Sequence, residues 1–96
     1  MGLFNFTQQP ALGETTGANS PFELGLMYST GGTVPVDYVT AHKWFNIAAM
    51  NGNTEAIRLR REIAAEMTAA EIATALRAAR DWMRENAATD QIRTAA

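Results

Sequence analysis

The stretch from Leu24 to Ala56 limits what this chain can fold into more than any other part of the sequence. It contains two segments with helical spacing of apolar residues, separated by the turn 31–36, and the second segment stops at Gly52. Glycine permits the left-handed backbone that ends a helix, and Pro35 prevents a helix from continuing through the turn. The order of helix, turn, helix and stop predicts an all-α fold.

Each predicted helix starts at a residue suited to capping it. Ser20 precedes Pro21 and lies three residues before Glu23, which is the pattern of a capping box with proline at the first helical position. Thr68 and Glu71 form a second capping box, without the proline. We therefore expect about four antiparallel helices, the first from Ser20 to about Thr30, the second from its cap Asp37 to about Asn51, the third from Asn53, and the fourth from Thr68 to about Asn86.

The apolar residues of these helices recur every three or four positions, as expected of helices that pack through one face. Gly25 lies in the middle of the first helix, where glycine costs about 1 kcal/mol relative to alanine, and close packing of two helices explains its presence. The chain divides into a flexible arm (1–19), a helical domain (20–86) and a frayed tail (87–96). The predicted core consists of Phe22, Leu24, Met27, Tyr28, Trp44, Phe45, Ile47, Leu59, Ile63, Ile72, Leu76, Trp82 and Met83.

Composition excludes several classes of protein. The 96 residues carry a formal charge of −2 with acids and bases interspersed, so no field of one sign attracts nucleic acid. Cysteine is absent, which excludes disulfides, thiolate metal sites and cysteine nucleophiles. We see no signal peptide and no apolar run long enough to cross a bilayer, and we expect a soluble, cytoplasmic protein without a membrane partner.

The residues of the central stretch resemble a Sel-one-like repeat, an α/α repeat related to tetratricopeptide repeats. The resemblance covers about residues 21–56, and the segment 57–86 resembles the C-terminal helical extension of bacterial members. It implies an α/α superhelix-type fold and an adaptor that presents a helical groove to a partner. The positions that match the repeat are Leu24, Gly25, Tyr28, Gly31, Val34, Asp37, Ala41, Trp44, Ala48, Ala49, Gly52 and Ala56.

A single repeat rarely buries its core alone, because repeat proteins bury it by stacking neighbours. We expect the third and fourth helices to act as the neighbour on one side and to leave a face of the first two helices uncovered. Trp44 is assigned to the core, while Phe45 lies on an adjacent face and is a candidate for an interface. The candidate partner contacts are Met27, Tyr28, Tyr38, Phe45 and Met50, with core packing as the alternative for each.

No residue pattern indicates catalysis. His42 is the only histidine, no serine or acid stands in a triad-like relation to it, and we expect a surface or half-buried position on the second helix. The acids Asp81 and Glu85 alternate with arginines, as solvated ion pairs do. The chain is therefore not expected to be an enzyme, and no cofactor or metal is expected.

Two functions remain open. The first is a non-catalytic protein–protein interaction module, an adaptor or scaffold that binds a protein or peptide. The second is a self-associating structural protein, in which the apolar arm residues Leu3 to Phe6 or the face of the first two helices seal against a second copy. A nucleic-acid-associated regulator is a remote alternative, because Arg58, Arg60 and Arg61 are interleaved with glutamates.

Overall fold

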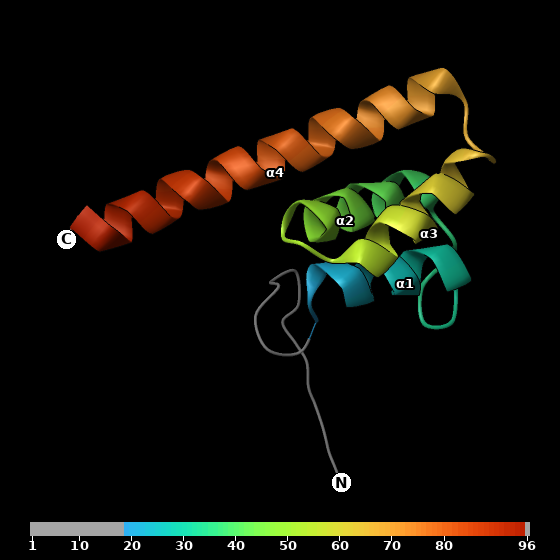
Figure 1. The fold of residues 1–96 in the computed structure, drawn as a ribbon, viewed down its shortest axis with the longest axis horizontal. Helices are drawn as coiled ribbons and strands as arrows, with labels where there is room; N and C mark the ends of the chain where they lie inside the picture. Colours follow the sequence, from blue (N-terminus) through green and yellow to red (C-terminus); the bar gives the residue numbers. More distant parts are fainter. Residues whose placement is uncertain (1–18, 96) are drawn as a thin grey trace, which may run out of the picture.

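The computed structural model describes the backbone of residues 19–95 and the side chains of residues 19–87. That part of the chain forms four helices and no strand, in the order α1 (Pro21–Thr30), α2 (Tyr38–Met50), α3 (Thr54–Ala64) and α4 (Ala69–Ala95). The predicted all-α fold is confirmed (Figure 1). No helix within the described residues is long and apolar enough to cross a membrane.

The predicted caps are present at the start of each helix. In α1 the Ser20 side chain accepts a hydrogen bond from the backbone N–H of Glu23, and the Glu23 carboxylate accepts one from the N–H of Ser20. Thr68 and Glu71 form the same reciprocal pair at the start of α4. These bonds satisfy backbone donors that have no partner inside the helix, so each start is fixed by local sequence. Asp37 and Asn53 cap α2 and α3 through single side-chain oxygens bonded to backbone N–H groups.

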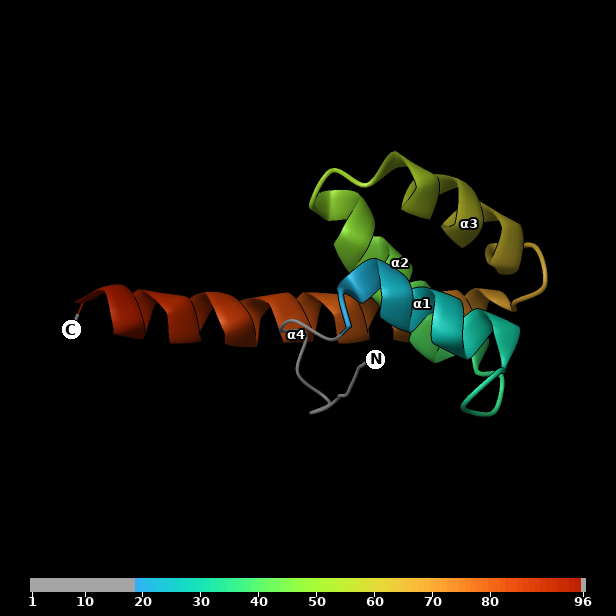
Figure 2. The ribbon, with the colours of Figure 1, turned by 90° about the horizontal axis from the view of Figure 1, so that it is seen from below.

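Helix α2 is the centre of the fold. It packs against α1, α3 and α4, and α4 runs along one side of it while α1 and α3 lie on other sides (Figures 1 and 2). Seven of its thirteen residues are buried. The expectation that one face of the first two helices stays uncovered is wrong for α2, because α3 and α4 pack on two different sides of it instead of stacking together on one.

The first core lies between α1, α2 and α3. Phe45 is completely buried at its centre, and the Phe22 ring packs against it with 5.9 Å between ring centroids. Gly25 lets α1 approach this ring, since a Cβ atom at Gly25 would stand 2.5 Å from two atoms of Phe45. The close packing predicted for Gly25 is confirmed. The remaining members of this core include Ala41, Ala48, Ala56 and Ile63.

The second core lies between α2 and α4. Trp44 and Ile47 of α2 are buried against Ala79, and the Trp44 and Trp82 rings meet edge to face with centroids 5.4 Å apart. Edge-to-face pairs bring the positive ring edge to the negative face of the neighbour. The Lys43 ammonium lies 4.5 Å from the centroid of a Trp44 ring and covers its outer side. Trp44 is thus a core residue, as its spacing predicts.

The ends of the chain differ from expectation or lie outside the described part. Helix α4 continues to Ala95, so the predicted end near Asn86 and the frayed tail are placed too early. Segment 87–95 contains neither glycine nor proline, and without either residue no local signal stops the helix. The structure shows α4 extending well past the other helices (Figure 2). Residues 1–18 of the predicted arm (1–19), which include its apolar segment, lie outside the described residues.

We expect Gly25→Ala to destabilise the protein, although alanine is the better helix former. Overpacking a tight core costs about 1–3 kcal/mol, and removing a mid-helix glycine gains about 1 kcal/mol, which leaves a net loss of up to about 2 kcal/mol. Urea unfolding followed by circular dichroism measures the change. In a double-mutant cycle with Phe45→Leu, the loss caused by Gly25→Ala should shrink, because the contacting ring atoms are gone. A more stable single variant would contradict the close contact.

Candidate functional site

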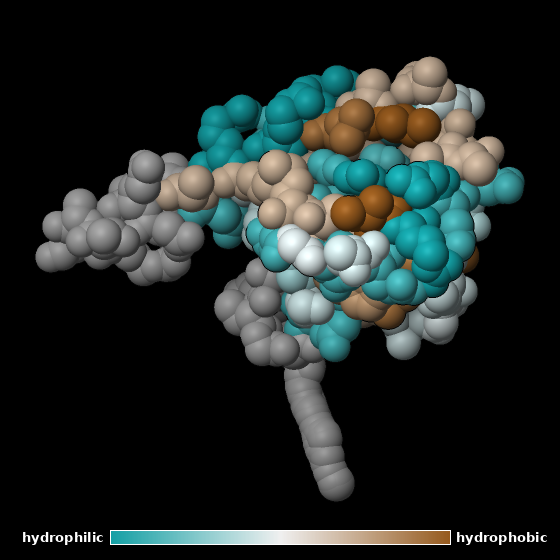
Figure 3. All heavy atoms as spheres, in the orientation of Figure 1, coloured by the Kyte–Doolittle hydropathy of each residue, from teal (hydrophilic) through white to brown (hydrophobic). Residues whose placement is uncertain are grey.

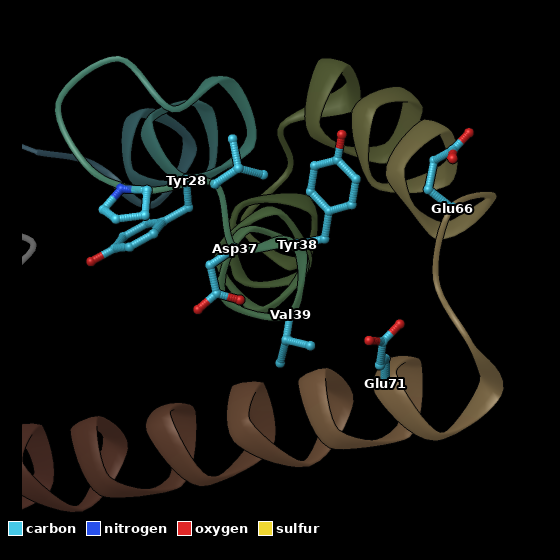
Figure 4. Close-up of a pocket in the computed structure, with 8 residues that line it drawn as sticks. Tyr28, Asp37, Tyr38, Val39, Glu66 and Glu71 are labelled. Atoms are coloured by element: carbon cyan, nitrogen blue, oxygen red, sulfur yellow. The ribbon is translucent and has the colours of Figure 1, made fainter.

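The site that the structure builds is an open pocket of about 570 Å³ where three segments meet. These segments are the α1–α2 turn, the first turn of α2, and the connection from α3 into α4 (Figure 4). Its lining combines aromatic and aliphatic side chains with three carboxylates. The lining residues are Tyr28, Pro35, Val36, Asp37, Tyr38, Val39, Glu66 and Glu71.

The turn between α1 and α2 builds one wall. Gly31 has φ 77°, the left-handed conformation, and ends α1 with its N–H bonded to the carbonyl of Met27 at 3.0 Å. The chain then returns so that the Asp37 N–H donates to the Tyr28 carbonyl at 2.9 Å. Val36 passes so near Gly31 that a Cβ atom there would lie 2.6 Å from its Cγ2. The exposed Pro35 and Val36 are therefore held beside Tyr28 by backbone geometry.

The opposite wall comes from the connection between α3 and α4. Glu71 lies in the first turn of α4 and is oriented by its capping bond with Thr68. Glu66 lies in that connection just after α3 ends, and Figure 4 places Glu66 at its α3 side and Glu71 at its α4 side. Two side chains of α2 stand between the walls, with Tyr38 directed toward α3 and Val39 toward α4.

The pocket joins an apolar surface to a negative rim. Val36 is 54 % exposed, and apart from Met50 it is the only large hydrophobic side chain among the described residues that is so exposed. Within the part of the chain that the structure describes, no lysine, arginine or histidine lines the pocket. On the face shown in Figure 3, hydrophobic surface gathers beside the first half of α4, and hydrophilic side chains cover most of the surface around it. The arrangement suits non-covalent binding.

The structure brings together two of the five predicted contact residues. Tyr28 and Tyr38 both line the pocket, each half-buried with one side against the core. Met27 is half-buried on α1 and outside the pocket lining, and Met50 is 65 % exposed at the far end of α2. The assignment of Phe45 to an interface is wrong. Its ring is 0 % exposed, because α1 covers the face of α2 that was expected to be open.

Sequence reasoning missed most of the pocket. Val36 and Pro35 were assigned only to a turn, and Glu71 was recognised only as a cap. Nothing in the sequence indicates that Glu66 belongs to a pocket, because an isolated glutamate near a helix end is ordinarily solvated. These residues meet only because the α3–α4 connection passes the start of α2, and that approach depends on how α3 and α4 pack on different sides of α2.

His42 is more buried than expected. It is 3 % exposed, and its Nδ1 atom has no hydrogen-bond partner among the described residues. Burial lowers the pKa of His42 from its ordinary value of 6.5, and the positive Arg60 guanidinium lowers that pKa further. Arg60 itself donates to the Asn46 side-chain oxygen. The imidazole does not line the pocket, so it supplies no proton-transfer group there.

Neither metal-ligating residues nor similarity to known proteins indicates the role of the pocket. Within the described residues no group of three or more histidine, cysteine, aspartate or glutamate side chains is placed to hold a metal ion. Comparison with protein-family models, with curated proteins and with solved structures finds no match. The pocket must therefore be interpreted from its own chemistry.

We expect the two adjacent glycines of the turn to respond oppositely to alanine. Gly31→Ala places a side chain at φ 77° and against Val36, and a left-handed residue with a Cβ atom costs about 1–2 kcal/mol. Gly32→Ala meets nothing within 4 Å and should be neutral or stabilise by up to about 1 kcal/mol. Urea midpoints of the two variants, compared with the parent, measure the difference. Equal losses would contradict the turn geometry.

Stability should fall as the pH is lowered below about 6.5. A histidine whose pKa is lowered by folding binds its proton more readily in the unfolded chain, so the contribution is present above the unfolded pKa and is lost as the pH falls. Because His42 is the only histidine, an NMR titration reports its pKa without assignment ambiguity. Urea unfolding between about pH 7.5 and 5.5, where carboxylates stay ionised, should show a slope that His42→Gln removes. A measured pKa of 6.5 or above would refute this.

Proposed function

We propose that this chain is a non-catalytic interaction module that holds a segment of a partner protein in the pocket between the α1–α2 turn and the α3–α4 connection. One observation supports the proposal above all others. The pocket is a preformed hollow of about 570 Å³ with aromatic and aliphatic side chains left partly exposed. Protein-binding sites combine an apolar centre, often aromatic, with a polar rim, which is the distribution found here.

The rigid placement of the lining favours binding without a large ordering cost. Tyr28 contacts both cores, Tyr38 packs against the first core, and Val36 is held by the turn. Side chains that are already fixed lose little conformational entropy when a partner arrives. The resemblance to Sel-one-like repeats points in the same direction, since an adaptor role is what that resemblance implies.

Self-association through a broad apolar face receives less support. Among the described residues, Val36 and Met50 are the large hydrophobic side chains that are more than half exposed, and Met50 lies outside the pocket. A stable dimer needs a contiguous patch of about 800 Å² on each copy. Two separate side chains do not make such a patch, whereas an open pocket of about 570 Å³ can hold a short peptide.

Peptide selection followed by a matched pair of variants tests the proposal. Twelve-residue peptides (about 40 Å when extended) displayed on phage are selected on the immobilised full chain, and enriched peptides are synthesised with a fluorescent label. Fluorescence anisotropy then gives their Kd for the parent chain, for Val36→Ser and for Met50→Ser. We expect Val36→Ser to weaken binding about tenfold, since a buried valine contributes about 1.5 kcal/mol.

Met50→Ser is the matched control, because it removes another exposed apolar side chain outside the pocket. It should leave the Kd within about twofold, a difference of less than 0.5 kcal/mol. Loss of binding in Met50→Ser with no effect of Val36→Ser would move the site to the end of α2. Failure to enrich any peptide above a blank surface would overturn the proposed function.

A further inference from the structure

We propose that the partner segment held in the pocket is basic, with an arginine or lysine next to an apolar residue. This inference rests on the proposed function and names the chemistry of its partner. The apolar residue would contact Val36 and the tyrosines, and the cation would lie among the carboxylates of Asp37, Glu66 and Glu71.

Among the described residues, the charge of the pocket lining is entirely negative. Three of the eight described lining residues are carboxylates and none is basic, so a bound cation meets attraction from more than one side. The carboxylates come from different segments, Asp37 from the start of α2, Glu66 from the end of the α3 region and Glu71 from α4. Tertiary packing has thus placed Asp37 at the same apolar hollow as Glu66 and Glu71, which come much later in the sequence.

These three carboxylates lack the cationic partners that acids elsewhere in the fold have. Glu55 and Glu62 both pair with Arg58, and Asp81 pairs with Arg84. In the pocket, Asp37 accepts from the N–H and hydroxyl of Thr40, and Glu71 accepts from the N–H of Thr68. No described residue forms an ion pair with either of them. Their charge is therefore available to a ligand.

Of the three carboxylates, that of Glu66 is the most available to a bound cation. Its side chain is exposed, and within the described residues it has neither a hydrogen-bond donor nor an ion-pair partner. A cation bound beside it would gain attraction without displacing an existing contact. Electrostatic complementarity of this kind raises the association rate and excludes acidic competitors.

The apolar wall favours a side chain that is both long and cationic. Tyr28 and Tyr38 offer aromatic rings, beside which the stem of an arginine or lysine can lie while its charged end reaches the rim. A guanidinium also stacks on aromatic faces and bonds carboxylates through two donors at once. Arginine therefore matches the pocket better than lysine does.

Charge also argues against the chain's own N-terminal arm as the occupant. Segment 1–19 contains one acidic residue, Glu14, and no lysine or arginine. Such a segment supplies apolar side chains but no side-chain cation for the rim. A partner protein that carries a basic segment meets both requirements of the pocket.

The test uses the peptides selected on the full chain. We expect them to be enriched in arginine or lysine beside apolar residues, relative to the unselected library. Replacing the arginine of an enriched peptide with citrulline, which keeps its shape and removes its charge, should weaken binding about tenfold or more, as for loss of a charge-assisted hydrogen bond. Binding of the charged peptide should also weaken as salt rises from about 0.05 to 0.5 M.

On the protein side, the double variant Glu66→Gln/Glu71→Gln removes two charges. Glutamine can still serve as the third helical residue of a capping box, so the start of α4 keeps its reciprocal bonds. We expect the Kd of the basic peptide to rise about three- to tenfold, as for two exposed ion pairs. Glu62→Gln, the same change on α3 outside the pocket lining, should leave the Kd unchanged.

The outcomes separate this inference from the proposed function. Enriched peptides without basic residues, whose binding depends on Val36 but not on Glu66 and Glu71, would overturn the inference and leave an interaction module. Equal binding of arginine and citrulline peptides would do the same. If no peptide is enriched, both proposals fall. If the enriched sequences match an arginine-bearing segment of this chain, the partner is a second copy and the basic-segment inference stands.

Discussion

The packing of the Phe45 ring against Gly25 is the contact on which the rest of the structure depends. It brings α1 close to α2, and a single added Cβ atom would stand 2.5 Å from the ring. With α1 at this distance, Phe22, Ala41 and Ile63 close over the same core. Because protein interiors are packed at the density of organic crystals, such a contact sets the position of whole helices.

Helix α2 is buried on several sides, and this position has consequences for its polar residues. His42 and Asn46 are 3 % and 8 % exposed, although both side chains are polar. Arg60 from α3 donates to Asn46, while the Nδ1 atom of His42 has no hydrogen-bond partner among the residues that the structure describes. Burying an unsatisfied polar atom costs free energy, so the position of His42 at the centre of the fold lowers the stability of the folded protein.

The features that start and end the helices also form the pocket. Gly31 ends α1 and brings Val36 beside Tyr28, and the capping bond of Glu71 starts α4 and orients one rim carboxylate. The ends of these helices thus supply an apolar wall and a charged rim of the pocket. A pocket assembled from helix ends is held by short-range backbone geometry, which favours a preformed binding site.

The sequence by itself determined where the helices start, their caps and the turn at Gly31, because each depends on interactions among residues near one another in the chain. A glycine in the middle of a helix also indicated a close approach at Gly25, but not that the Phe45 ring of α2 is the group it meets. Only the tertiary structure decided that Phe45 is a core residue and that Tyr28, Tyr38, Glu66 and Glu71 share a pocket. Helical spacing shows that a residue lies on an apolar face, but it does not show which helix covers that face. That choice depends on how α3 and α4 pack around α2, which is a property of the whole chain.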